Sequence, residues 1–179
     1  MVVEHVEGVT EPWVQDLLCA LLGALHREKP TVLELGGFLG HTSARLACAL
    51  HGMGGGRLIV AEWDPAAPER ADAVDAWLAS LKLDGVDWRV VRSDALTVIA
   101  QQPDESLDFV FLDDDHQHEH VAQELAALMS KVRAGGLICG HDVHGLTDLQ
   151  QEFARYPNSL SLDFPRLGPA GGLGIIQCV

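Results

Sequence analysis

The chain has 179 residues, of which 47% are hydrophobic, and its formal net charge at pH 7 is −14. This length and apolar content fit one buried core, so we expect a single domain over 1–179, with a helical segment at 1–29 and the core at 30–179. The acidic excess argues against a nucleic-acid partner, because phosphate binding needs clustered Lys and Arg. Neither a secretion signal nor an apolar run of membrane-spanning length is present, so we expect a cytoplasmic protein with no membrane partner.

Short apolar runs alternate with longer amphipathic ones along the chain. The first amphipathic run predicts a helix at 11–27, with Pro12 in its first turn. The short runs predict strands, most of them continuously apolar as in strands buried on both faces, at 31–35, 57–62, 88–92, 107–112 and 136–140. Helical patterns between and after them lie at 41–50, 66–81, 95–101 and 119–132.

Two further strands are expected near the C-terminus, at 160–164 and 174–179. A Gly/Pro-rich connection joins them without a long helix, which favours an antiparallel hairpin at one edge of the sheet. The whole pattern predicts an α/β fold: a Rossmann-like, doubly wound sheet of seven strands, mostly parallel, with a C-terminal antiparallel hairpin. Ligands of such sheets bind beyond the carboxyl ends of the strands.

A glycine-rich turn follows the first strand, in the segment Glu-Leu-Gly-Gly-Phe-Leu-Gly at 34–40. Glycine lets the backbone approach a ligand closely, and the amides of the following helix can face a bound group. The turn is not the dinucleotide fingerprint G-x-G-x-x-G, because two of its glycines would fall on Phe38 and His41. A glycine turn can also serve steric needs alone, so it is weak evidence by itself.

Acids follow four successive strands: Glu34 in the first, Glu62 after the second, Asp94 after the third and Asp113 after the fourth. Each could be no more than a helix cap. Because the carboxyl ends of parallel strands share one edge, however, four acids at four such ends favour a common ligand site.

The segment at 34–43 resembles that of class I S-adenosylmethionine-dependent methyltransferases, in which an acid precedes a Gly-x-x-x-Gly turn. Its sequence, Gly-Gly-Phe-Leu-Gly-His-Thr-Ser, is similar to that of the catechol-type O-methyltransferases. The resemblance implies that the turn passes the methionine part of S-adenosylmethionine, that Glu62 meets the ribose and that Asp94 lies beside the adenine amine. The cofactor-binding residues that it implies are Glu34, Gly36, Gly37, Phe38, Gly40, Thr42, Ser43, Glu62, Trp63, Asp94, Ala95 and Asp113.

Carboxylates and imidazoles are concentrated at 113–120, Asp-Asp-Asp-His-Gln-His-Glu-His, and at 140–144, Gly-His-Asp-Val-His. Adjacent carboxylates repel one another, so their concentration suggests cations or hydrogen bonds that compensate. The alternative is that His118 and His120 are exposed helix residues. His116 and His120 have the spacing of one helix face, but a zinc pair there would lack a third ligand.

These two segments are similar to Asp-Gly-Asp-His-Ser-Tyr-Glu and Gly-Gly-…-His-Asp of a group of small class I methyltransferases that includes many bacterial enzymes and is related to the catechol-type enzymes. The resemblance covers roughly residues 30 to 155. It implies Asp113, His141 and Asp142 as ligands of a divalent metal, and His116 and Asp113 as catalytic residues, with His116 as the base. Val143 stands where metal-dependent relatives have Asn, which leaves the ligand set open, and Asp115 could replace or supplement Asp113.

The function that we expect is methyl transfer from S-adenosylmethionine to an oxygen of a small hydroxylated molecule. A divalent metal such as Mg or Mn would lower the pKa of the hydroxyl, and an imidazole would take its proton. The alternatives are N-methylation and a non-catalytic adenosylmethionine-binding or partner subunit. Related enzymes often form dimers, so a homodimer stays open. The segments expected to set specificity, at 2–10, 145–148 and 166–172, carry no recognisable chemical code.

Overall fold

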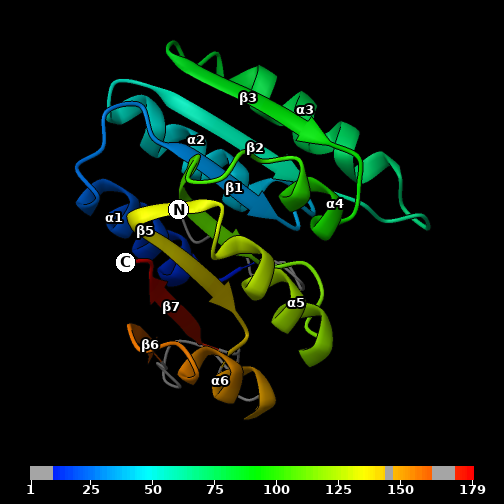
Figure 1. Ribbon diagram of the computed structural model, residues 1–179. Coiled ribbons are helices and arrows are strands. Elements are labelled where there is room, and N and C mark those ends of the chain that lie inside the picture. Colours follow the sequence, from blue (N-terminus) through cyan, green and yellow to red (C-terminus); the bar gives the residue numbers. More distant parts are fainter. Residues whose placement is uncertain (1–9, 144–146, 163–171) are drawn as a thin grey trace.

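The computed structural model describes residues 10–143, 147–162 and 172–179 (Figure 1). Their seven strands form one sheet in the order β3-β2-β1-β4-β5-β7-β6. The strands are β1 (Thr31–Leu35), β2 (Gly56–Ala61), β3 (Val86–Val91), β4 (Leu107–Leu112), β5 (Val132–His141), β6 (Ser159–Leu162) and β7 (Leu173–Gln177). The first five run parallel, while β7 is antiparallel to both β5 and β6. The predicted fold class, including the C-terminal antiparallel hairpin, is therefore confirmed.

Helices cover both faces of the sheet (Figure 1). One face carries α1 (Pro12–Ala24), α2 (His41–Gly52) and α3 (Glu69–Leu81), and the other carries α4 (Ala95–Ala100), α5 (His118–Leu128) and α6 (Thr147–Ala154). The central strand β4 is buried at all six positions. Its Phe109 and Phe111 pack on the α1–α3 side, and Val110 and Leu112 pack on the α4–α6 side. Burial on both faces is the reason for its nearly continuous apolar sequence.

Several predicted element boundaries differ from the observed ones, and two helices show why. The helix predicted at 119–132 ends at Leu128, because β5 begins at Val132. Leu125, Leu128 and Val132 all enter the same core, so the helical apolar spacing continues into the strand and hides the boundary. The helix predicted from 66 starts at Glu69, after a turn in which the Asp64 carboxylate accepts the Ala66 amide.

Helix α6 was not predicted at all. Its two buried apolar residues, Leu149 and Phe153, lie one turn apart, which is too short a stretch to establish a helical period from sequence. The expected strand at 160–164 is present up to Leu162, and its last two positions lie outside the described residues. No helix in the described ranges combines the length and apolar character needed to cross a membrane.

The five parallel strands end in line. The register sets Val91, Ala61, Leu35, Leu112 and Gly140 side by side across the sheet. The residues that follow these strands therefore lie along one edge of the sheet, as predicted for the acids at the strand ends. We call this edge the carboxyl edge.

Candidate active site

Two adjoining hollows lie along the carboxyl edge. The first, of about 360 Å³, lies beside the ends of β1, β4 and β5, and the second, of about 380 Å³, lies toward the ends of β2 and β3. Both are lined by Gly36, Phe38, Asp113 and Asp114, so they form one continuous depression. Each is large enough for part of a small-molecule ligand.

The turn after β1 separates the two hollows and is tightly fixed. Gly36 has φ +88°, and a Cβ atom there would lie 2.3 Å from the carbonyl oxygen of Asp113, so only glycine fits. Phe38 also adopts a left-handed conformation, with φ +45°, which is unusual for an aromatic residue. Its amide donates to the Glu62 carboxylate at 2.6 Å, and the Arg70 guanidinium lies 4.7 Å from the centre of its ring. The end of β2 thus holds the turn in place.

Glu34 and Ser43 lie beneath this turn rather than in either hollow. The Ser43 hydroxyl donates to the Glu34 carboxyl at 2.5 Å, and Glu34 is 1% exposed. Burial raises the pKa of Glu34 to about 8, against the Ser43 hydrogen bond, and the charges of Asp113 and Glu62 add to the increase. At neutral pH this acid is mostly uncharged. Its position is that of a support for the turn, not of a direct ligand contact.

Four of the predicted residues line the second hollow but not the first: Glu62, Trp63, Asp94 and Ala95. Asp94 also caps α4, because its carboxylate accepts the amide of Thr97 at 2.9 Å. The helix cap, which the sequence analysis gave as the alternative to ligand binding, is therefore present, and Asp94 lines the hollow as well. Burial raises the pKa of Glu62, and the Phe38 amide opposes that increase. Trp63 is 57% exposed and lies at the rim.

The first hollow contains Gly37, Thr42 and the deepest charged groups of the site. His141 lies between two carboxylates, with Nε2 2.8 Å from Glu11 Oε2 and Nδ1 3.0 Å from Asp113 Oδ1. Thr10 donates to the other oxygen of Asp113 at 2.6 Å. Burial lowers the pKa of His141, but its bonds to Asp113 and Glu11 outweigh burial and raise that pKa to about 10.

His116 and Asp142 complete this group. Nε2 of His116 lies 3.0 Å from Asp142 Oδ2 and 3.8 Å from Asp113 Oδ1, and the imidazole is partly open to the hollow. Asp113 and then Asp142 raise the pKa of His116 to about 10, against burial. Asp142 sits at the end of β5 with φ +55°, which turns its carboxylate back toward the hollow. The four residues predicted to meet at this edge do meet there.

Possible metal ligands differ in detail from the predicted set. Asp113, His116 and His141 each offer a ligand atom, and these atoms lie within 4.8 Å of one another. His116, predicted only as a base, thus belongs to the geometric set. Asp142, predicted as a ligand, lies beside that set, with Oδ1 3.6 Å from His141 Nδ1.

The sequence missed Glu11 and Thr10 as members of the site. Glu11 was interpreted only as the start of a helix, but it is 5% exposed and its carboxylate faces His141 rather than capping α1. The sequence feature that could have pointed to this role is an acid next to Pro12 at the start of an apolar helix.

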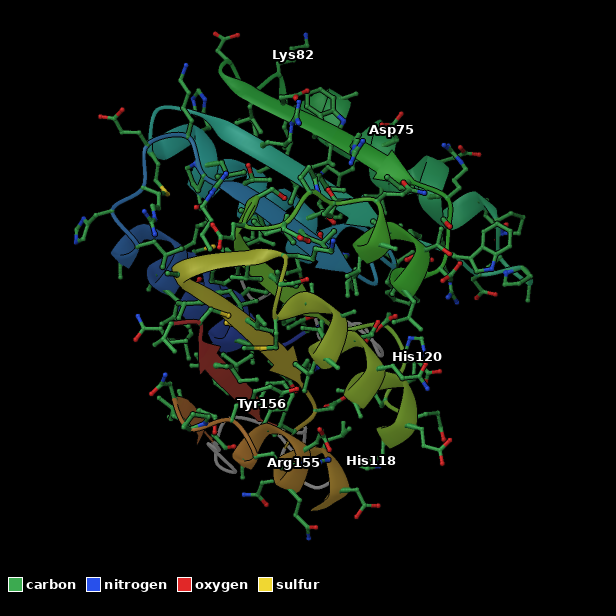
Figure 2. The ribbon with its side chains drawn as sticks, viewed as in Figure 1. Asp75, Lys82, His118, His120, Arg155 and Tyr156 are labelled. Atoms are coloured by element: carbon green, nitrogen blue, oxygen red, sulfur yellow. The ribbon has the colours of Figure 1, made fainter. Side chains whose placement is uncertain are left out.

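The three histidines of 116–120 have separate partners. Because α5 begins at His118, His116 precedes the helix and does not share a helix face with His120. His118 is exposed and lies 3.3 Å from Glu152 of α6. His120 is half-buried and faces Asp114 and Glu124 instead. Figure 2 shows His118 on the α6 side of α5 and His120 away from it.

Comparisons with known proteins agree with this geometry. A family model described as a methyltransferase domain matches residues 33–143. Similar solved structures include cofactor-bound Rv0187 from MTB, with 20% identity, a TM-score of 0.74, and coverage of 96% of this chain and 82% of that chain. Another is an O-methyltransferase from Bacillus cereus in complex with SAH, with 21% identity, a TM-score of 0.67, and coverage of 96% and 84%.

A third is the O-methyltransferase TomG from Streptomyces achromogenes in complex with SAM, with 20% identity, a TM-score of 0.68, and coverage of 100% of this chain and 93% of that chain. No curated protein sequence matches the chain. At these identities the structures establish the fold, whereas the family model spans well over half of the sequence, including the glycine turn and the groups at the ends of β4 and β5. The chain belongs to the methyltransferase domain family.

Proposed function

We propose that the protein is a methyltransferase that uses S-adenosylmethionine to methylate an oxygen of a small hydroxylated molecule. The observation that carries the proposal is the continuous depression along the carboxyl edge, divided by the fixed turn at Gly36. Two of the similar structures are O-methyltransferases solved with SAH or SAM, which supports the same ligand and reaction here.

The second hollow has the donor and acceptor groups that an adenosyl group needs. The Glu62 carboxylate, held at one oxygen by the Phe38 amide, has a further oxygen that can accept from ribose hydroxyls. Asp94 lines the same hollow at the end of β3, where its carboxylate can accept from an adenine amine. Trp63 at the rim offers an aromatic surface to the base.

The turn itself suits the methionine end of the cofactor. Gly36 and Gly37 leave no side chain over the depression, and a Cβ at Gly37 would lie 2.7 Å from a methyl group of Val60. Gly40, with φ +80°, begins α2, whose first amides can face a carboxylate. Thr42 lines the same hollow. The cofactor supplies a methyl group on a sulfonium, and this turn would hold that group between the two hollows.

The acceptor belongs in the first hollow, beside His116 and Asp142. The His116 imidazole is partly open to this hollow, and its Nε2 lies 3.0 Å from Asp142 Oδ2, so proton exchange with a substrate hydroxyl requires that this carboxylate release it. Asp113, with His141 and Asp142 beside it, is a suitable donor set for a divalent cation and leaves His116 free to act as the base. Such a cation would take over the carboxylates that now hold the His116 proton and would polarise a substrate hydroxyl. In this proposal His116 then accepts the hydroxyl proton.

Calorimetry with S-adenosylmethionine and S-adenosylhomocysteine tests the cofactor assignment directly. We expect both to bind, and Glu62→Gln to weaken binding about tenfold, equivalent to roughly 1.4 kcal/mol. No binding of either molecule would refute the proposal. Screening of hydroxylated acceptors with mass detection then tests the reaction, because only methyl transfer adds the mass of one CH₂ group. Activity that persists fully in a chelator would exclude the metal.

A further inference from the structure

A second group of metal-ligating side chains lies at the start of α5. Asp114 comes from the loop after β4, and His120 and Glu124 lie one turn apart on α5, where i and i+4 side chains share a face. Nε2 of His120 lies 3.4 Å from Asp114 Oδ2 and 3.2 Å from Glu124 Oε1. One ligand atom from each residue lies within 4.8 Å of the others. We call these three residues the α5 cluster.

Glu124 is the member that most needs a partner. Its side chain is fully buried, yet neither carboxylate oxygen has a hydrogen bond of acceptable geometry within the described part of the chain. Buried polar atoms are nearly always satisfied, and an unsatisfied carboxylate is among the most costly. Burial, followed by the charge and close approach of the Asp114 carboxylate and the charge of Asp115, raises the pKa of Glu124 to about 9. A cation that displaced the proton of Glu124 would gain a buried carboxylate beside an imidazole and a second carboxylate.

The α5 cluster is separate from the group in the first hollow. The adjacent residues Asp113 and Asp114 have different partners. The Asp113 carboxylate contacts His141 and Thr10, and the Asp114 carboxylate contacts His120. Asp114 and His120 line the second hollow, whereas Glu124 lies behind them. Figure 2 shows His120 projecting from the side of α5 opposite to His118. The two candidate ligand sets have no residue in common.

We propose that Asp114, His120 and Glu124 bind a divalent cation of the zinc class at the inner edge of the second hollow. One imidazole nitrogen and two carboxylate oxygens are ligands that zinc accepts in four-coordinate sites, and three protein ligands leave one position for water. Magnesium is disfavoured there, because it prefers oxygen ligands in an octahedral arrangement. The cation would neutralise acids at the ends of β4 and α5 and would tie the first turns of α5 to the loop that borders the hollow.

The test uses the metal-stripped full chain and Zn²⁺ as the probe, with Co²⁺ absorption as a second readout of imidazole ligation. Glu124→Gln and His120→Asn should each weaken Zn²⁺ binding at this site at least tenfold and remove the cobalt signal that belongs to it. Glu119→Gln is the matched control, because Glu119 is an exposed acid on the same helix. Asp142→Asn is the control for the first hollow, and it should keep the α5 site.

Folding is checked by the thermal midpoint without metal. We expect Glu124→Gln to match or exceed the parent, because an amide replaces a buried group that is otherwise protonated. Zn²⁺ should raise the midpoint of the parent and of Glu119→Gln but not that of Glu124→Gln. If Glu124→Gln fails to fold, His120→Asn carries the same comparison at a half-buried position. Equal Zn²⁺ stoichiometry and affinity in the parent and the folded cluster variants would overturn the proposal, whatever the outcome for adenosylmethionine.

Discussion

Glu34 is a buried acid whose ionisation couples pH to the stability of the fold. Its pKa is about 8 in the folded chain, where burial penalises the charged form, against an ordinary value of 4.5. For an acid whose folded pKa is raised, the stabilising contribution is fully present below the unfolded pKa and is lost as pH rises through the folded pKa. The window for this acid therefore runs from pH 4.5 to about pH 8.

The substitution Glu34→Gln removes this titration and keeps the neutral hydrogen-bonding group beside Ser43. Each pKa unit corresponds to about 1.4 kcal/mol, so between about pH 5.5 and pH 8.5 the parent should lose about 3 kcal/mol of unfolding free energy relative to the variant. Below pH 4.5, where Glu34 is protonated in both the folded and the unfolded chain, the two proteins should be similarly stable. Above pH 8 the variant should be clearly the more stable of the two.

Urea unfolding at a series of pH values measures this difference, because the midpoint and slope give the unfolding free energy at each pH. Glu28→Gln is the matched control, since it makes the same chemical change at an exposed position. Its curve should run parallel to that of the parent. Parallel curves for the parent and Glu34→Gln would refute the reasoning, because they would mean that Glu34 has the same ionisation state in the folded and unfolded chains.

Substitutions at three further positions probe the carboxyl edge. Gly36→Ala places a Cβ 2.3 Å from the carbonyl oxygen of Asp113, so it should lower both the thermal midpoint and the affinity for S-adenosylhomocysteine. Unchanged affinity would contradict the role given to the turn. Glu11→Gln removes one of the two carboxylates on buried His141 and should cost about 1–3 kcal/mol of stability in urea unfolding while sparing cofactor affinity, so an unchanged midpoint would count against the pairing. Asp94→Ala removes the α4 cap, so it should lower the unfolding free energy by about 1 kcal/mol and should also weaken cofactor binding. Asp94→Asn should keep the cap and weaken binding alone. Urea unfolding measures the first effect and calorimetry the second.

The carboxyl edge could be predicted because local patterns determine it. Continuously apolar runs identified the buried parallel strands, and the alignment of their ends follows from the sheet itself. Glu62, Asp94 and Asp113 could then be placed together with no knowledge of side-chain packing. The resemblance added His116 and Asp142, which pair at 3.0 Å.

The contacts that were missed depend on how distant elements dock. Glu11 meets His141 across a sequence separation of 130 residues, and only the packing of α1 against the sheet brings them together. The α5 cluster depends on Asp114, which precedes α5 in the chain and meets His120 only through the path of the loop after β4. The end of that helix was hidden for a related reason, since Val132 enters the same core as Leu128 while belonging to a strand.

The buried acids of the carboxyl edge differ in what offsets their charge, and the difference explains why a cation is proposed for α5. Glu34 stays mostly neutral at pH 7, Glu62 accepts a backbone amide of the glycine turn, and Asp113 is held by two imidazoles and a hydroxyl. Asp94, an exposed acid of the same edge, accepts the Thr97 amide in the first turn of α4. Among the buried acids of this edge in the described ranges, Glu124 alone has no hydrogen bond of acceptable geometry at either oxygen, so even its uncharged form lacks the partner that Ser43 provides for Glu34. The same electrostatic requirement that pairs the other acids with protein groups therefore points to an external cation at this one.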